Sequence, residues 1–220
     1  MEQTLTWAEM AEWWDNKQGD TGDLRHRSLI DPSVLKMIGN VSGQQVLDMA
    51  CGNGYLSWKL AKTGAKVTGV DSSAPIIERK IARETREPMG VHYHSLEANN
   101  LEGLSSSTYD LVICNMALMD MPDADGAIRE ASRVLKRNGR FVASISHPCF
   151  DMGPGSAWVI EKEPGKKAVV YRKVSDYRKP HSMTIPWKDG ESRWNTISYH
   201  RPLSWYFPDA PHRESFCNRV

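Results

Sequence analysis

Two aspartates around a glycine-rich turn have the types and spacing of a ligand-binding site. Asp48 lies just before the turn Gly52-Asn53-Gly54, and Asp71 follows the turn further along the chain. Glycine has no Cβ atom, so a ligand can approach the backbone of such a turn closely. A carboxylate at position 48 would repel a pyrophosphate and would suit a ligand with an ammonium or sulfonium group. The site therefore favours a cationic ligand.

A strand before the turn and a helix after it must position these residues. Val46, Leu47 and Met49 predict a short apolar strand, and residues 55–62 have helical spacing. A strand, a glycine turn and a helix form the first half of a nucleotide-binding βαβ unit. The pattern Gly-x-Gly-x-x-Ser over residues 52–57 also nearly fits the dinucleotide fingerprint, so an NAD(P)-dependent oxidoreductase remains an alternative.

The run Val-Leu-Asp-x-x-Cys-Gly-x-Gly over residues 46–54 resembles the first motif of class I S-adenosylmethionine (SAM)-dependent methyltransferases, in particular the bacterial type 11 group. The resemblance covers residues 40–150. It implies SAM as cofactor, S-adenosylhomocysteine (SAH) as product and methyl transfer to a small molecule by in-line attack on the sulfonium methyl. A SAM-binding protein without catalysis is a further alternative. The expected cofactor contacts are Asp48, Ala50, Cys51, Gly52, Asn53, Gly54, Asp71, Ser72, Glu97, Ala98, Asn115 and Met116.

Five of these residues lie at or just after the ends of three predicted strands. Asp71 ends the strand 66–70 and lies about 20 residues after Gly52, the spacing expected of a ribose-binding acid. The alternative role of Asp71 is to cap the next helix. In the methyltransferases that this chain resembles, an acidic residue followed by a small residue contacts the adenine, and Glu97 and Ala98 lie at the matching position. Glu97 could also be a solvated loop residue. Asn115 ends the strand 109–115 and Met116 follows it, and both would face the ligand crevice.

Start signals predict two helices before the first strand. Thr6 and Glu9 form a capping box for a helix that reaches about residue 17. Asp31 is the expected N-cap of a second helix, with Pro32 at its first position and Gly39 at its end.

The segment between these helices, residues 19–27, is predicted to be a polar loop. In the resembling family, a segment before the first strand often folds over the cofactor. Trp14 and Arg27 are therefore candidates for a lid that contacts SAM. The alternative is that the tryptophans of the first helix pack it on the domain.

Two histidines are the candidate catalytic residues. His147 follows the predicted fifth strand, 141–145, and His200 follows a β-rich segment. Imidazole titrates near pH 6.5, so either could act as a base if the acceptor is protonated at neutral pH. Either could equally be structural. The Asx-Pro-Pro-aromatic run typical of enzymes that methylate base amines in nucleic acids does not follow the fourth strand.

The alternation of strands and helices predicts an α/β fold with a Rossmann-like parallel sheet flanked by helices. A helix before the fifth strand is expected to end at Gly139. We expect one domain over residues 1–220, with N-terminal helices and a lid in 1–40, the core in 41–150, and an antiparallel β insertion with a shortened C-terminus in 151–220.

The edge of the predicted fifth strand needs a cover. Exposed strand edges invite pairing with other chains. Residues 168–174 or 194–200 could dock beside this strand, or the edge could pair in a homodimer.

Composition narrows the class of protein. The chain has 220 residues and a formal net charge of +1, so its charge does not favour nucleic acid as a partner. Its four cysteines include no Cys-x-x-Cys pair, which indicates neither a metal site nor a disulfide framework and fits a cytoplasmic location. Neither a signal peptide nor an apolar run near 20 residues is present, so we expect no membrane insertion.

Overall fold

The computed structural model describes residues 3–150 and 155–207. The chain divides into two compact units. The sheet unit comprises residues 6–118 and 123–145. The β-rich unit comprises residues 3–5, 119–122, 146–150 and 155–207 of the described chain.

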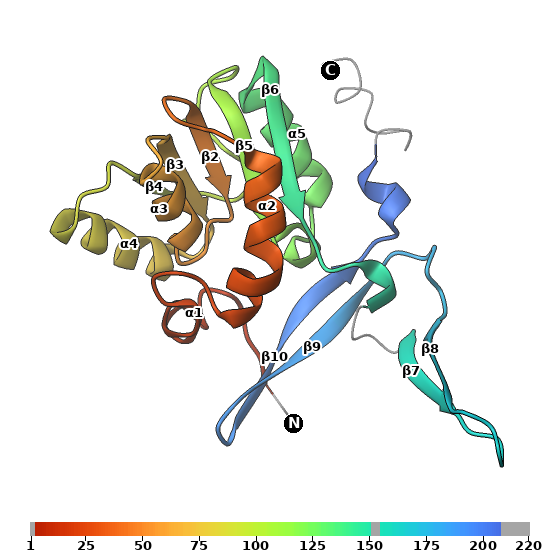
Figure 1. Ribbon diagram of the computed structural model, residues 1–220. Coiled ribbons are helices and arrows are strands. Elements are labelled where there is room, and N and C mark those ends of the chain that lie inside the picture. The colour runs from red at the N-terminus through yellow and green to blue at the C-terminus, as the bar shows by residue number, and fades with distance from the viewer. Residues whose placement is uncertain (1–2, 151–154, 208–220) are drawn as a thin grey trace. The chain divides into compact units, whose positions relative to one another are not determined.

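A five-stranded parallel sheet is the centre of the sheet unit (Figure 1). Its strands are β2 (Gln45–Met49), β3 (Lys66–Asp71), β4 (His92–Ser95), β5 (Tyr109–Asn115) and β6 (Leu135–Ser144). Their spatial order is β4-β3-β2-β5-β6, so the strand order reverses beside β2. Open α/β sheets bind ligands at such a switch point, outside the carboxyl ends of the strands. The Rossmann-like parallel sheet predicted from the sequence is confirmed.

Helices flank this sheet (Figure 1). They are α1 (Ala11–Gln18), α2 (Asp31–Ile38), α3 (Tyr55–Ala61), α4 (Ala74–Arg86) and α5 (Ala124–Val134). Residues from α2, α3 and α4 share one buried cluster with the strands, including Ile38, Leu60 and Ile76. In the described part of the chain, no helix combines the length and the apolar character needed to cross a membrane.

The N-terminal helices differ in part from their prediction. The capping box is present, because Glu9 accepts hydrogen bonds from the backbone N–H and the hydroxyl of Thr6. Residues 7–10 form turns, however, and the α-helix begins at Ala11. The prediction that Asp31 is an N-cap is wrong. A short π-helix over His26–Ile30 runs directly into α2, so Asp31 is already helical and its carboxylate is used elsewhere.

The boundary between α5 and β6 also differs from the prediction. The helix ends at Val134, and β6 begins at the next residue, so Gly139 lies inside the strand instead of ending the helix. The register of β6 against β5 shifts between Tyr109 and Leu111, which accommodates this early start. Further along β6, the Arg140 guanidinium donates to the last carbonyls of α2 and holds that helix against the strand.

Antiparallel strands form the β-rich unit, as the sequence predicted for the insertion. In one sheet β10 (Ser192–His200) pairs antiparallel with β9 (His181–Asp189) and parallel with the short β1 (Gln3–Thr4). A separate hairpin joins β7 (Ser156–Glu161) and β8 (Val169–Val174). The two segments considered as a cover for β6 therefore pair with other strands.

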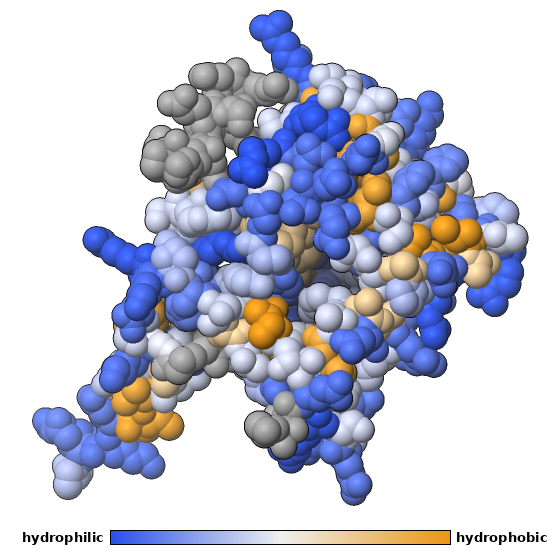
Figure 2. Space-filling model, turned by 180° about the vertical axis from the view of Figure 1, so that it is seen from behind, coloured by the Kyte–Doolittle hydropathy of each residue, from blue (hydrophilic) through white to orange (hydrophobic). Residues whose placement is uncertain are grey.

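The hairpin exposes large apolar side chains. Trp158 and Ile160 are each 62% exposed, and Val170 is 58% exposed. These residues alternate along their strands and so share one face of the hairpin. In Figure 2 the hairpin, at the lower left, carries an orange patch beside strongly blue side chains.

Candidate functional site

The glycine turn follows β2 and depends on left-handed backbone conformations. Gly52 has φ +52° and Gly54 has φ +69°, and Ala50 just before them also has a positive φ. A Cβ atom on Gly54 would lie 2.7 Å from the hydroxyl of Tyr93, and one on Gly52 would lie 3.2 Å from Nε1 of Trp14. The space that the glycines leave open is therefore partly filled by these two aromatic side chains.

Asp71 fixes the turn from the end of the neighbouring strand β3. Its Oδ2 accepts the Gly52 backbone N–H at 2.8 Å, and its Oδ1 accepts the Ser73 N–H at 2.9 Å. Burial raises the pKa of the Asp71 carboxyl and the charge of Glu97 adds to this, while the two N–H bonds oppose it. Asp71 therefore has both the turn-fixing role and the position expected of a ribose-binding acid.

Asp48 lies beneath the turn and is only 1% exposed. Its Oδ2 accepts the hydroxyl of Ser57 from the first part of α3 at 2.6 Å. Burial raises the pKa of this carboxyl to about 7, and the charge of Asp71 contributes in the same direction, while the Ser57 bond opposes it. A nearby cation would stabilise the ionised form of such a carboxyl.

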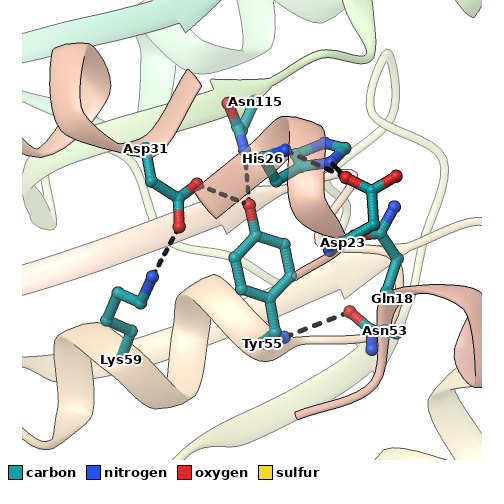
Figure 3. Close-up of polar contacts among 8 residues, drawn as sticks. All are labelled: Gln18, Asp23, His26, Asp31, Asn53, Tyr55, Lys59 and Asn115. Atoms are coloured by element: carbon teal, nitrogen blue, oxygen red, sulfur yellow. Dashed lines mark hydrogen bonds and ion pairs between the residues drawn. The ribbon is translucent and has the colours of Figure 1, made fainter. Parts of the chain in front are cut away.

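A chain of polar contacts crosses the carboxyl ends of the strands (Figure 3). The Tyr55 hydroxyl donates to Asp31 Oδ1 at 2.8 Å, and Lys59 pairs with the other oxygen of Asp31. Asn115, at the end of β5, donates to the Tyr55 hydroxyl at 3.2 Å and accepts from the Ser144 hydroxyl at 2.6 Å. The chain links α2, α3, β5 and β6, and it fixes the orientation of Asn115.

The N-terminal segment covers the same turn. The Asn53 amide donates to the carbonyl of Gly19, the residue after α1, at 2.7 Å. Trp14 and Tyr55 each contact the ring of His26 edge to face. Asp23 binds the Nδ1 atom of His26 at 2.8 Å, so this ring is held in one orientation. Sequence reasoning found Trp14 but not Asp23, His26 or Tyr55; the spacing of Asp23 and His26, three residues apart, was the available signal.

The other predicted cofactor residues occupy several environments. Cys51 is buried, and burial raises the pKa of its thiol. Met116 has a positive φ, and its N–H donates to the Ser144 hydroxyl at 2.9 Å. The remaining residues lie on loops or on the π-helix: Ser72, Glu97 and Arg27 are exposed, and Ala98 is half-buried.

Both predicted catalytic histidines belong to the β-rich unit. His147 is exposed, and its Nδ1 accepts the Cys149 N–H at 3.2 Å. His200 is 5% exposed, stacks on the ring of His181 with ring centres 4.7 Å apart, and has Nε2 2.9 Å from the carbonyl of Tyr177. Because a carbonyl only accepts, Nε2 carries the proton in the neutral His200 ring.

The β-rich unit also holds a buried acid that sequence reasoning missed. Burial raises the pKa of the Asp120 carboxyl to about 7, and a hydrogen bond with the Ser198 side chain opposes this. The Arg201 guanidinium donates to the carbonyls of Met121 and Pro122, next to this acid. No sequence signal marks Asp120, because its burial depends on residues far along the chain.

Comparisons with known proteins agree with this architecture. A family model described as a methyltransferase domain matches residues 40–179. The ubiquinone biosynthesis O-methyltransferase of Hydrogenovibrio crunogenus is 29% identical over 127 residues, which cover 58% of this chain and 52% of the relative. The protein of the same name from Albidiferax ferrireducens is 33% identical over 132 residues, 58% of this chain and 50% of the relative. The chain spans about half the length of these curated relatives.

A solved structure extends the match beyond the core. A SAM-dependent methyltransferase from Mesorhizobium loti gives a TM-score of 0.61 at 25% identity, covering 79% of this chain and 74% of that chain. A parallel sheet with a glycine turn after β2 and an acid at the end of β3 therefore defines a class I, SAM-type methyltransferase fold. The chain belongs to the methyltransferase-domain family. These matches do not favour the NAD(P)-dependent alternative.

The residues of the site fit SAM by their chemistry. Two carboxyl groups lie beside the turn, which suits a ligand with cationic groups and a ribose. Two buried polar atoms in the same region, Gln18 Nε2 and Ser73 Oγ, have no hydrogen-bond partner within residues 3–150 and 155–207. Buried polar groups in native proteins nearly always have partners, so a polar ligand at the turn would complete the site.

Proposed function

We propose that this protein transfers a methyl group from SAM to a small-molecule acceptor by in-line attack of an acceptor nucleophile on the sulfonium methyl. The observation that supports this most directly is the 2.8 Å bond between Asp71 and the Gly52 N–H. It joins the acid at the end of β3 to the glycine turn after β2, and both lie within the residues that the methyltransferase family model matches.

Bound SAM supplies an electrophilic methyl group. Asp71 would hold the ribose, because each carboxylate oxygen has a second lone pair after accepting one N–H. Ionised Asp48 would favour the cationic methionine half, and Ala50, Cys51, Gly52, Asn53, Gly54 and Ser72 would line it. Glu97 and Ala98 would meet the adenine, and Trp14, Arg27, Asn115 and Met116 would border the methyl group and its acceptor. Much of the rate would come from holding the reacting atoms within about 3–3.5 Å of each other.

The acceptor atom in this proposal is a hydroxyl oxygen. The curated relatives carry the name O-methyltransferase, which supports this choice. A hydroxyl acceptor loses its proton during transfer, so a base contributes at neutral pH. His147 and His200 remain the proposed bases.

Calorimetry and turnover test the function in two steps. Titration of the protein with SAM, SAH and NAD should show binding of SAM and SAH and none of NAD. A panel of phenol, catechol, primary amine and thiol acceptors should then release SAH with the hydroxyl compounds. Binding of NAD instead of SAM would support an oxidoreductase. SAM binding with no turnover on any acceptor would indicate a binding protein without catalysis.

Self-association and cellular location extend the proposal. We propose a homodimer through the edge of β6, since β8 and β10 pair with other strands and β6 is the last strand of its sheet order. Light scattering over a dilution series tests it, and a strict monomer at micromolar concentration would exclude it. A cytoplasmic location is proposed because Cys51 and Cys149 form no disulfide within the part of the chain that the structure describes, as a reducing compartment allows.

A further inference from the structure

Gln18, the last residue of α1, has a buried side-chain amide whose NH₂ group is an unsatisfied hydrogen-bond donor. It is only 3% exposed. Its Oε1 accepts the backbone N–H of Asp23 at 3.1 Å. An N–H requires an acceptor, so this bond fixes which end of the amide faces Asp23 and leaves Nε2 on the other end. Nε2 is buried and has no hydrogen-bond partner among the residues that the structure describes.

The contacts of Gly19 and Trp14 bring the end of α1 to the cofactor turn. The neighbouring carbonyl, that of Gly19, accepts the Asn53 amide at 2.7 Å, so the end of α1 is attached to the middle of the turn. Trp14 lies four residues earlier and on the same face of α1. Its Nε1 is 3.2 Å from the position that a Cβ would take on Gly52. Figure 3 shows Gln18 grouped with Asp23 and His26 beside Asn53.

The unsatisfied Nε2 donor of Gln18 can pair with only some groups of the cofactor. An amide Nε2 donates two hydrogens and accepts none, so it pairs with an acceptor and not with an ammonium or a sulfonium. The amino-acid end of SAM and SAH carries one carboxylate, and the remainder of SAH carries no formal negative charge. Resting on the proposed function, we infer that Gln18 Nε2 donates to the carboxylate of the cofactor's amino-acid end and makes binding selective for cofactors that retain it.

A purely structural role for Gln18 explains the hydrogen bond of Oε1 but not the buried Nε2. The bond from Asp23 to Oε1 holds the loop after α1, and a structural residue needs no more than this. It does not explain a buried donor without a partner. The two roles use different ends of the side chain, so a substitution can separate them.

Gln18→Glu makes that separation. The glutamate keeps an oxygen for the Asp23 N–H but replaces the donor with a second oxygen, which repels a carboxylate. At pH 9, at the upper end of the range of about 8–9 that the pKa of a buried glutamate reaches, we expect the dissociation constant for SAH to rise about tenfold or more, because hydrogen bonds to charged groups are strong. Binding of 5′-methylthioadenosine, which has the same nucleoside and no amino-acid end, should stay within about twofold of the wild-type value.

Gln44→Glu is the matched control. Gln44 lies before β2, at the opposite end of that strand from the turn, and its Nε2 already donates to the carbonyl of Asn40. The same change of amide to carboxylate there should leave the affinity for both ligands unchanged. Thermal unfolding of both variants without ligand reports whether the fold is intact.

The outcomes separate the inference from the function on which it rests. Equal weakening of SAH and 5′-methylthioadenosine by Gln18→Glu would show that Gln18 only supports the turn. No weakening of SAH would show that the amide does not meet the carboxylate. Wild-type protein that binds neither compound would instead overturn the proposed function. Selective loss of SAH alone supports the inference.

Discussion

The sheet unit and the β-rich unit bury their apolar side chains to very different extents. In β5 of the sheet unit, Leu111, Val112 and Ile113 are each 0% exposed. In the β7–β8 hairpin of the β-rich unit, Trp158 and Ile160 are each 62% exposed. A parallel sheet with helices on its faces buries its central strands completely. A two-stranded hairpin depends on its cross-strand pairs and is marginal by itself. Similar apolar sequences therefore contribute very different stability in the two units.

Buried acids make the two units more alike. Asp48 in the sheet unit and Asp120 in the β-rich unit each have a pKa raised to about 7 by burial. Each has a hydrogen bond with a serine hydroxyl, from Ser57 and Ser198 respectively, which opposes the shift. Neither carboxyl forms an ion pair with a cation in the described part of the chain. Only the carboxyl of the sheet unit lies beside the glycine turn.

The largest expected effect tests the difference in burial directly. Leu111→Ala removes a fully buried side chain from β5 and should lower the free energy of unfolding by about 2–5 kcal/mol. Ile160→Ala removes a mostly exposed one from β7 and should cost less than about 1 kcal/mol. Urea denaturation followed by circular dichroism measures both.

A large effect of Ile160→Ala would break this comparison. It would mean that the apolar face of the hairpin is covered in solution. Repeating the denaturation at several protein concentrations would then show whether a second copy provides the cover, because the stability of an associated state depends on concentration.

The sequence predicted the sheet unit well because its signals are local. Val46 and Leu47 before a glycine turn define both the strand and the turn within a few residues, and β2, β3 and β5 lie where expected. The antiparallel sheet was harder to predict. Pro186 lies within β9, and proline normally argues against a strand. It is tolerated here because β9 is last in the strand order of its sheet.

The candidate site could be predicted only in part. Asp48, Gly52 and Asp71 follow from one motif and one spacing. The bonds of Tyr55 to Asp31 and to Asn115 join residues 24 and 60 positions apart in sequence, which no local pattern indicates. The error at Asp31 has the same origin, because its carboxylate binds Tyr55 and Lys59 instead of capping a helix.

The second prediction uses Asp48 and Asp120 to compare the pH dependence of stability in the two units. Each carboxyl has a pKa of about 7 when folded and about 3.9 when unfolded. The folded state therefore binds these protons more tightly. The stability that each group contributes is complete below about pH 4 and is lost as the pH rises through 7. Between pH 5 and 8 the free energy of unfolding of the ligand-free protein should fall.

Asparagine variants measure how much Asp48 and Asp120 each contribute to this pH-dependent loss of stability. Asn cannot ionise, so Asp48→Asn and Asp120→Asn should each reduce the loss between pH 5 and 8 by up to about 3 kcal/mol, since about two pH units of this window lie below the folded pKa and each corresponds to about 1.4 kcal/mol. Amide hydrogen exchange at several pH values assigns the change: Asp48→Asn should alter protection in the sheet unit, and Asp120→Asn in the β-rich unit. Equal changes in both units for either variant would mean that the units unfold together.

The smallest of these effects concerns ligand binding within the sheet unit. Asp71→Ala should weaken SAM binding by about 1.5–3 kcal/mol, the range for hydrogen bonds that involve a charged group. It also removes the acceptor for the Gly52 and Ser73 N–H groups, so the ligand-free protein should lose stability too. Asp110→Ala is the matched control, because Asp110 also accepts a backbone N–H, that of Gln45 at 2.8 Å, and lies near the amino end of β5.

The two variants together separate binding from stability. Both lose a carboxylate that holds a backbone N–H, and only Asp71 lies at the carboxyl ends of the strands, where open α/β sheets bind ligands. Calorimetry with SAM should therefore show a weaker affinity for Asp71→Ala and a wild-type affinity for Asp110→Ala, while thermal unfolding shows a lower midpoint for both. Unchanged SAM affinity in Asp71→Ala would mean that this acid serves only to hold the turn and the start of α4. The ribose would then have to be bound by other residues of the sheet unit.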